Sequence, residues 1–286
     1  MTQPVHAAQP GDLVEPIPQR HPSHEPSFWS SFLSFFEKTF TLVGLEVRKM
    51  RHDPTDLITR AVQPALWLLI FGNVFTHLRA IPTGGKPYLD FMAPGILAQS
   101  VLFISIFAGI AIIWERDLGV VHKFLASPTP RIALVLGKAL GAGIRSLVQA
   151  FFIYLLALIM GVQMNWNPLA LLGVIVIVLM GASCFSTFSL IIACLVRSRE
   201  RFMGFGQVLT MPLFFASNAI YPVAIMPPWL QVIAHSNPLS YEVDALRGLM
   251  LAGGDLSMVW LDFLVLFVVM TALVLIGAAL YPRVAQ

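Results

Sequence analysis

The sequence contains few charged residues. Only 12% of its 286 residues are charged and 57% are hydrophobic, whereas a soluble domain carries about 25% charged residues. So little charge cannot cover a surface that faces water, and lipid must therefore be the solvent for most of the chain. The composition excludes an ordinary soluble protein, and a net charge of +3 gives no indication of nucleic-acid binding.

The sequence motifs of common catalytic and metal centres are also missing. No G-x-x-x-x-G-K-[ST] phosphate loop occurs, and the nearest match, Gly85-Lys86, is followed by Pro87. There is no H-E-x-x-H motif, no nucleophile elbow and no cluster of Cys and His residues. Cys184 and Cys194 lie in one apolar run and are interpreted as small buried hydrophobic residues. We therefore expect no catalytic residue, metal or cofactor in this chain, and no ATP hydrolysis by it.

The N-terminal part differs from the rest. Residues 1–27 contain six prolines and no apolar core, which predicts a disordered cytosolic tail without a cleavable signal peptide. Residues 28–52 are predicted to form an amphipathic helix that lies in the membrane interface. Its apolar face includes Phe28, Phe32, Phe36 and Phe40. The alternative is an ordinary packing helix, but the basic cluster around residues 48–51 favours the interfacial position.

Residues 53–286 are predicted to form an all-α polytopic membrane domain. Six stretches each supply about 20 or more mostly apolar residues, enough to cross roughly 30 Å of hydrocarbon. These stretches are 59–79, 89–114, 132–161, 168–196, 204–222 and 257–281. An even number of spans places both termini on the same side of the membrane.

The basic residues indicate which side that is. With the N-terminus inside, thirteen of the eighteen Lys and Arg residues fall on the cytosolic side, and only Arg79, Lys86 and Arg247 fall outside. This asymmetry follows the positive-inside rule. It predicts a multi-pass protein of the bacterial inner membrane with cytosolic termini. Lys138 and Arg145 lie within the third span, where they can snorkel or point into a polar interface.

The predicted outer segment, residues 223–256, is of mixed polarity and rich in proline. Its helical stretches are too short to span a membrane, so we expect two short helices that dip back into the outer leaflet and are covered by protein. Asp262 is the only acid clearly inside a span, about one turn from its outer end. It is interpreted either as a proton or substrate site or as a satisfied interfacial acid.

The cytosolic loop 115–131, ERDLGVVHKFLASPTPR, is the first informative motif. It leaves the membrane at Glu115, turns at Gly119 and continues into a short amphipathic helix that prolines end. An apolar helix face held at the cytosolic surface is suited to docking on a partner; the alternative is a plain turn between spans. The candidate residues are Glu115, Arg116, Asp117, Gly119, Lys123, Phe124, Leu125, Ser127, Pro128 and Arg131.

The second motif is SNPLSYEVDALR, residues 236–247. Asn237-Pro238 predicts a turn, and Ser240 is expected to cap the helix that follows. Glu242 and Asp244 near the helix start suit its dipole, and Asp244 and Arg247 are spaced to pair as i and i+3. Taken alone, this motif is a well-capped helix.

Together the two motifs resemble the type 2 family of ATP-binding-cassette (ABC) export permeases over residues of about 30 to 281. The family has a cytosolic E-R-x-x-G…L-x-[ST]-P-x-x-R loop and an N-P-L-x-Y-x-x-[DE]-x-x-R element before its last span. The first pattern is met by Glu115, Arg116, Gly119, Leu125, Ser127, Pro128 and Arg131, and the second by Asn237, Pro238, Leu239, Tyr241, Asp244 and Arg247. One departure is Val120-Val121-His122, where many members have Thr and an acid.

The resemblance implies a permease subunit that takes its energy from a separate ABC ATPase, which binds ATP and Mg. It implies two permease copies, most simply a homodimer, with the 115–131 helix fitting a groove in the ATPase. A second cytosolic contact is expected at Arg197, Arg199, Glu200 and Arg201. The N-terminal helix is expected to gate lateral entry from the inner leaflet, and the outer helices to cap the exit.

The substrate is the least specified part of this interpretation. The apolar spans suit a lipophilic drug, lipid or glycolipid, and the resemblance favours the drug-resistance and nodulation-export branch. A polysaccharide or O-antigen exporter is an alternative within the same fold. An ion-coupled carrier would need a carboxylate at the midplane and internal repeats, and a membrane-embedded enzyme would need clustered polar residues within spans.

Overall fold

The structure, a computed structural model, describes residues 28–52, 54–78, 87–126, 129–196, 198–253 and 259–285. Regular secondary structure in these ranges is helical, apart from an isolated antiparallel bridge between Met164 and Leu251. The predicted all-α class is therefore confirmed for the described part of the chain. The tail predicted for residues 1–27 lies outside it.

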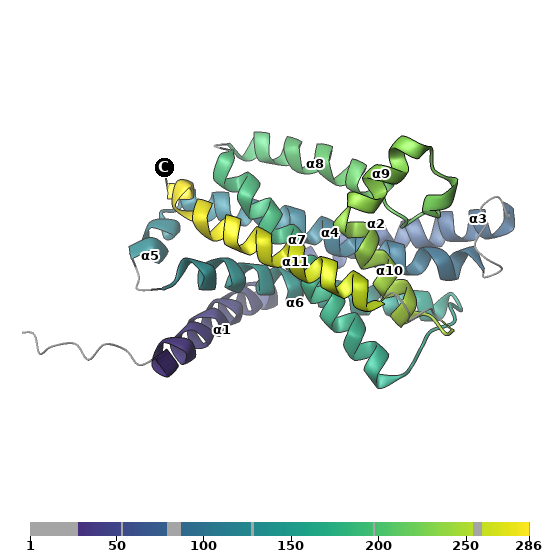
Figure 1. Cartoon of the computed structure of the whole chain (residues 1–286), viewed down its shortest axis with the longest axis horizontal. Helices are drawn as coiled ribbons and strands as arrows, with labels where there is room; N and C mark the ends of the chain where they lie inside the picture. The colour runs from purple at the N-terminus through teal and green to yellow at the C-terminus, as the bar shows by residue number, and fades with distance from the viewer. Residues whose placement is uncertain are drawn as a thin grey trace, which may run out of the picture.

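Four long helices form the body of the molecule. They are α4 (Tyr88–Asp117), α6 (Arg131–Ile159), α7 (Pro168–Leu195) and α11 (Val259–Leu280). Within the described ranges, these four are long and apolar enough to cross a membrane, α11 together with its 3₁₀ extension to Val284. They lie side by side along the long axis (Figure 1). Each covers most of a predicted span, so a membrane protein is confirmed, whereas six spans remain a prediction.

The first predicted span, 59–79, is occupied by a continuous but irregular helical run. It consists of α2 (Pro54–Leu66), a π-helical turn (Trp67–Phe71) and α3 (Gly72–Leu78). Pro64 lies inside α2, and proline removes one helical hydrogen bond. The interruption explains why this run does not form one regular long helix.

The predicted fifth span, 204–222, differs from the observed helix at both ends. Helix α8 runs from Arg199 to Phe215. It begins early because the Ser198 side chain accepts a hydrogen bond from the backbone N–H of Arg201, at 3.3 Å. It ends early because the Asn237 amide donates to the carbonyl oxygens of Leu213 (2.7 Å) and Ala216 (3.1 Å).

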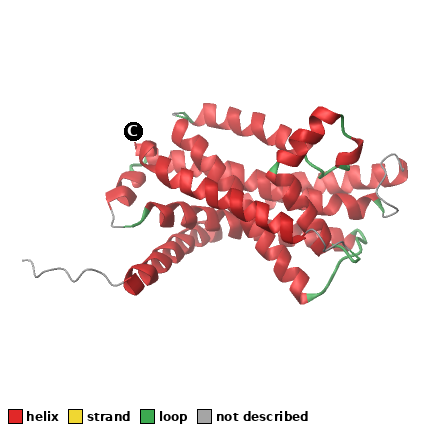
Figure 2. Ribbon diagram, in the orientation of Figure 1, coloured by secondary structure: helices red, strands yellow, loops and turns green. Residues whose placement is uncertain are grey.

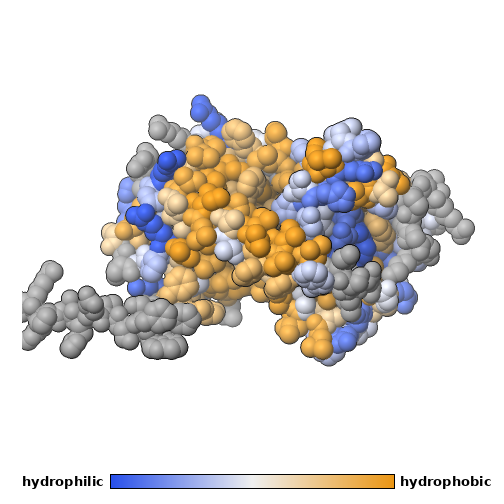
Figure 3. Space-filling view, in the orientation of Figure 1, coloured by the Kyte–Doolittle hydropathy of each residue, from blue (hydrophilic) through white to orange (hydrophobic). Residues whose placement is uncertain are grey.

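The two ends of the bundle carry different short elements. At one end lie α5 (Val120–Ala126) and the C-terminal turn (Tyr281–Ala285); toward the other lie α9 (Pro228–Ser236) and α10 (Pro238–Met250). We call them the α5 end and the α10 end. Most connecting segments lie toward these ends (Figure 2). A broad apolar surface separates them (Figure 3), as expected for a bundle with lipid around its middle.

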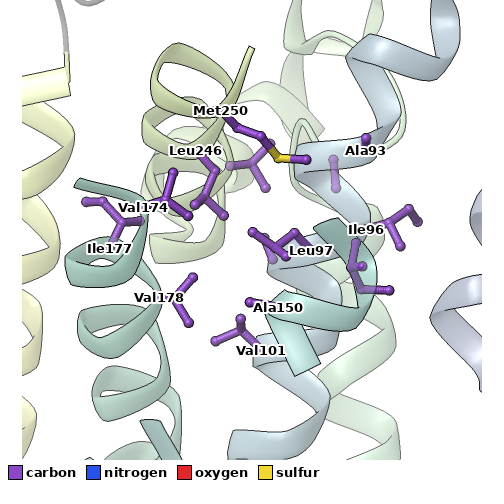
Figure 4. Close-up of a cluster of buried hydrophobic side chains, with 14 of the residues drawn as sticks. Ala93, Ile96, Leu97, Val101, Ala150, Val174, Ile177, Val178, Leu246 and Met250 are labelled. Carbon is purple, nitrogen blue, oxygen red and sulfur yellow. The ribbon is translucent and has the colours of Figure 1, made fainter. Parts of the chain in front are cut away.

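Helix α10 packs into the main hydrophobic core. Val101 of α4, Ala150 of α6, Val178 of α7 and Leu246 of α10 lie in one buried cluster (Figure 4). Helix α10 is covered by the rest of the bundle, since Leu239, Val243 and Leu246 are completely buried. Its place on the outer side of the membrane stays a prediction. A second cluster at the α5 end includes Ile113, Val121, Phe202 and Tyr281.

Candidate functional site

The two segments predicted to contact an ATPase meet at the α5 end. Asp117, the last residue of α4, accepts hydrogen bonds from Nη2 (2.7 Å) and Nε (3.0 Å) of Arg199, the first residue of α8. The Arg199 guanidinium also stacks 4.0 Å from the centre of the Trp114 ring. The hydrogen bond from Arg199 is the main cause that lowers the pKa of the Asp117 carboxyl below its ordinary value, with Arg116 contributing. The carboxylate is therefore charged at neutral pH and holds the two segments together.

Arg116 adds a second link between the same segments. Its Nη2 lies 3.3 Å from Asp117 Oδ1, and its Nη1 donates to the Val196 carbonyl oxygen at 3.5 Å. Glu200 and Arg201 are exposed beside them. The predicted contact residue Arg197 lies outside the described residues. Arg116, Asp117, Arg199, Glu200 and Arg201 thus form one charged surface.

Helix α5 is joined to α4 by a tight turn at Gly119. The residue has φ +70°, which favours glycine, and its N–H donates to the Arg116 carbonyl at 2.9 Å. Val121 is fully buried, and Phe124 and Leu125 pack partly buried against the cluster at this end. The predicted apolar docking face is thus largely used within the chain, because these residues cover the end of the core.

The side of α5 and its preceding turn that faces away from the core is exposed. Leu118 is 72% exposed, and His122 and Lys123 are also exposed. Arg131, which begins α6, is exposed nearby in sequence. Ser127 and Pro128 lie outside the described residues. Leu118, His122 and Lys123 are thus more accessible here than the predicted coupling residues Phe124 and Leu125, which are partly buried.

A buried charge cluster ties α1 (Phe28–His52) to α4 and α6. Glu46 of α1 accepts from Lys138 Nζ at 3.2 Å and from Arg145 Nη2 at 2.6 Å, and Lys138 also binds Glu115 of α4. The side chains of Glu46 and Glu115 are only 9% and 10% exposed. Of the two possibilities open for Lys138 and Arg145, the structure supports a polar interface. Glu115, predicted as part of the coupling loop, points into this cluster.

Two glycines let α1 approach α6 closely. A Cβ atom added at Gly137 would lie 2.6 Å from Cβ of Leu42, and one added at Gly141 would lie 2.7 Å from Cγ of Glu46. Glycines four residues apart are a common means of bringing membrane helices into close contact. Phe36 and Phe40 point away from this contact, with 43% and 64% of their surface exposed. The side chains of Phe28 and Phe32 are not described.

The outer motif is organised around Asn237 and Arg247. Asn237 caps α10, since its Oδ1 accepts from the Leu239 N–H at 3.0 Å, and Pro238 occupies the first turn. The predicted cap at Ser240 is therefore wrong, because α10 begins two residues earlier. Glu242 falls after the first turn and is completely buried, so the helix-dipole explanation for it is also wrong. The Tyr241 hydroxyl donates to the His235 carbonyl of α9 at 2.7 Å.

Arg247 connects α10 to α4 and to the turn after α8. It pairs with Asp244 at 3.0 Å, as predicted, and donates to the carbonyl oxygens of Asn218 (2.8 Å) and Phe91 (3.4 Å). Its guanidinium lies 4.0 Å from the centre of the Phe91 ring. The Asn218 amide also binds Asp244. Asp262 is buried in the first turn of α11.

The family is decided by a match across most of the chain. The sequence model described as "ABC-2 type transporter" matches residues 37–251. The chain belongs to the ABC-2 type transporter family. The matched range contains the buried charge cluster, α5, the start of α8 and the outer motif of this ABC-2 permease.

Several curated proteins are similar to this ABC-2 permease. A "Putative transport permease ycf38" of Cyanophora paradoxa is 31% identical over 222 residues, which cover 76% of each chain. A "Daunorubicin resistance ABC transporter permease protein DrrB1" of Streptomyces coeruleorubidus is 27% identical over 212 residues, 74% of each chain. A "Nodulation protein J" of Sinorhizobium fredii is 27% identical over 197 residues, 68% of this chain and 74% of the relative. The expected likeness to drug-resistance and nodulation permeases is confirmed.

Three features of the ABC-2 permease were not predicted from its sequence. They are the partnership of Glu46 with Lys138 and Arg145, the glycine contact at 137 and 141, and the role of Asn218 as partner of Asp244. The sequence does contain a signal for the first of these features. It has an acid among the apolar residues of the first helix and two bases seven residues apart. Nothing in the sequence near Asn218 indicated its contact.

Proposed function

We propose that this ABC-2 permease is the membrane subunit of an ABC exporter of the bacterial inner membrane. In this proposal the chain has six spans and cytosolic termini. Four spans are the long helices α4, α6, α7 and α11, and the other two are the irregular α2–α3 run and α8. Two copies pair as a homodimer, and a separate ABC ATPase supplies the energy and binds ATP and Mg. The transported substrate is a lipophilic drug, lipid or glycolipid.

The observation that carries the proposal is the junction between Asp117 and Arg199. The ion pair joins the α4–α5 turn to the start of α8, so the two predicted ATPase contacts form one surface. A movement imposed on this surface would reach both helices directly, and helix movements of this kind are a common way to open a path. The α5 end is also rich in bases, as expected of a cytosolic end.

We assign roles to α1, α9 and α10 from their positions in the bundle. Helix α1 is proposed to gate entry from the inner leaflet, because it lies obliquely against α6 (Figure 1) and leaves Phe36 and Phe40 exposed. Helices α9 and α10 are proposed to cap the exit. Arg247 and Asn237 would hold that cap against α4 and α8.

Site-specific cross-linking tests the proposed contact. In a background without Cys184 and Cys194, His122→Cys and Lys123→Cys should cross-link to a co-expressed ABC ATPase. The matched control is Trp229→Cys on α9, which is 66% exposed and lies toward the opposite end. Cross-linking of Trp229→Cys, or of none of the three, would count against the proposed ATPase surface.

A further inference from the structure

Helix α10 runs antiparallel to α7 and packs closely on two of its glycines. A Cβ atom added at Gly173 would lie 3.0 Å from Cδ1 of Leu249, and one added at Gly181 would overlap the carboxyl group of Glu242. Between these two points the helices share one buried apolar cluster (Figure 4). The Glu242 carboxyl therefore sits directly on the backbone of α7 at Gly181, and we call this contact the Glu242 slot.

The carboxyl of Glu242 is isolated inside the protein. The residue is completely buried, and neither oxygen has a hydrogen-bond partner among the described residues. Moving a charged carboxylate from water into such a site is far more costly than moving the neutral acid. Burial accordingly raises the pKa of Glu242 well above its ordinary value of 4.5. The docked arrangement of α10 therefore requires the carboxyl to carry its proton.

The groups around α10 do not compensate a negative charge at this position. The helices packed against α10 include α4, α7, α9 and α11. On α7, Cys184 interacts electrostatically with Glu242, but a thiol supplies no positive charge. The base on α10 itself, Arg247, pairs with Asp244 instead. Toward the α10 end, the other titratable groups of these helices interact elsewhere: Tyr88 with Ile220, Asp90 with Gln163, Tyr241 with His235, and both His235 and Asp262 with Asp244.

Separation of α10 from α7 changes the charge of this carboxyl. Water then reaches Glu242, and at neutral pH the O–H bond breaks, the proton passes to water and a hydrated carboxylate remains. For α10 to dock again, the carboxylate must take a proton from water. Because the pKa is raised only in the docked state, the docked state is fully stabilised below the ordinary pKa and loses stability as the pH rises toward the raised pKa. The loss is about tenfold in the docking equilibrium per pH unit.

We propose that Glu242 is a proton-binding site that locks α10 onto α7, with the protonated carboxyl seated on Gly181 and a proton released to water whenever α10 undocks. This inference goes beyond the proposed function, since it concerns the contact of two helices and needs no ATPase. Where α10 also caps the exit, opening the exit releases one proton from each permease copy and closing it takes one up.

Hydrogen–deuterium exchange of the full-length chain, purified in detergent without an ATPase, tests the lock. The protection of the backbone amides of α10, corrected for the pH dependence of intrinsic exchange, measures how often α10 undocks. From about pH 6 to 8, protection in the wild type should fall by up to about tenfold per pH unit. Glu242→Gln keeps a neutral side chain of the same shape and every other titratable group, so its protection should stay level over this range.

Glu37→Gln is the matched control, because Glu37 is exposed on α1, and it should keep the wild-type slope. Wild-type protection that does not change with pH, or the same slope in the wild type and Glu242→Gln, would overturn the proposal. Glu242→Met is a second neutral replacement and should also remove the slope. Loss of α10 protection at every pH in both neutral variants would overturn the proposal as well, because the lock requires only that the side chain is uncharged.

The fit at Gly181 is tested separately by a change in size. Gly181→Ala places a methyl group where the carboxyl lies, so α10 protection should fall by at least about fivefold, the lower limit for overpacking. Adding Glu242→Ala removes the overlap and should restore part of that protection. A double variant no better protected than Gly181→Ala would show that the carboxyl does not occupy the Glu242 slot.

Discussion

Glu46 of α1 is held between two basic residues of α6, with Lys138 Nζ at 3.2 Å and Arg145 Nη2 at 2.6 Å. The proposed gating helix is therefore fixed by buried charge pairs as well as by apolar contacts. Lys138 also binds Glu115 near the end of α4, just before the segment proposed to receive force from an ATPase. Ion pairs thus link the proposed gate to Glu115, which directly precedes Arg116 of the charged surface in the chain.

Removing the Glu46 charge should destabilise the permease. In Glu46→Gln, Lys138 keeps Glu115 as an acidic partner, whereas Arg145 loses the acid that it contacts in the described structure, and an uncompensated buried charge costs about 3–5 kcal/mol. Because Arg145 is partly exposed, we expect roughly the lower end of that range and a clear fall in the Tm of the purified protein. Glu37→Gln, on the exposed side of α1, is the control and should melt like the wild type.

The close contact of α1 with α6 should tolerate no added methyl group. Gly141→Ala places Cβ 2.7 Å from Cγ of Glu46, and Gly137→Ala places it 2.6 Å from Cβ of Leu42. Overpacking of this kind typically costs about 1–3 kcal/mol, so both variants should lower the Tm. Gly44→Ala on α1 meets nothing within 4 Å and should be neutral or slightly stabilising. The same Tm in all three variants would show that the glycines do not set the helix spacing.

The Asp117–Arg199 pair should matter for coupling more than for folding. Both side chains are more than a third exposed, and exposed ion pairs contribute little to stability. Asp117→Arg and Arg199→Asp should each keep a near-wild-type Tm while reducing substrate-stimulated ATP hydrolysis by the complex with its ATPase. The double variant restores opposite charges and should recover part of the stimulation. Full stimulation in both single variants would remove the pair from the coupling route.

Glu242 should behave in the opposite way to Glu46. Its carboxyl is completely buried and neither oxygen has a hydrogen-bond partner in the structure. A buried carboxyl without a hydrogen-bond partner is costly, so the apolar replacement of similar volume in Glu242→Met should keep or raise the Tm. A fall as large as that of Glu46→Gln would indicate that Glu242 has a partner in the assembled transporter.

The elements that sequence reasoning predicted well are those set by local composition. The apolar runs that form α4, α6, α7 and α11 are long enough to be recognised as membrane spans from composition alone. The spacing of Asp244 and Arg247 likewise predicts their pair, because neighbours on one helix do not depend on the rest of the fold. The C-terminal end of α8 could not be predicted, since Asn237, far along the chain, donates to the carbonyl groups there.

In the candidate site, sequence reasoning mainly missed contacts between residues that lie far apart in the chain. Glu46 is 92 residues from Lys138, and no local pattern connects them. The local sequence also could not predict which way the apolar face of α5 points. An amphipathic turn predicts an apolar face but not whether the face meets a partner or the chain itself, and here Val121 is buried against the bundle.

This permease should transport its substrate only together with a separate ATPase. Two kinds of proteoliposome should be compared, one with the purified permease alone and one with the permease and a co-expressed ABC ATPase, each supplied with a lipophilic drug or a lipid as substrate. We predict no ATP hydrolysis and no transport by the permease alone, and ATP-dependent transport by the complex. Robust, ATP-independent transport driven by substrate in the permease alone would show that it does not depend on a separate ATPase.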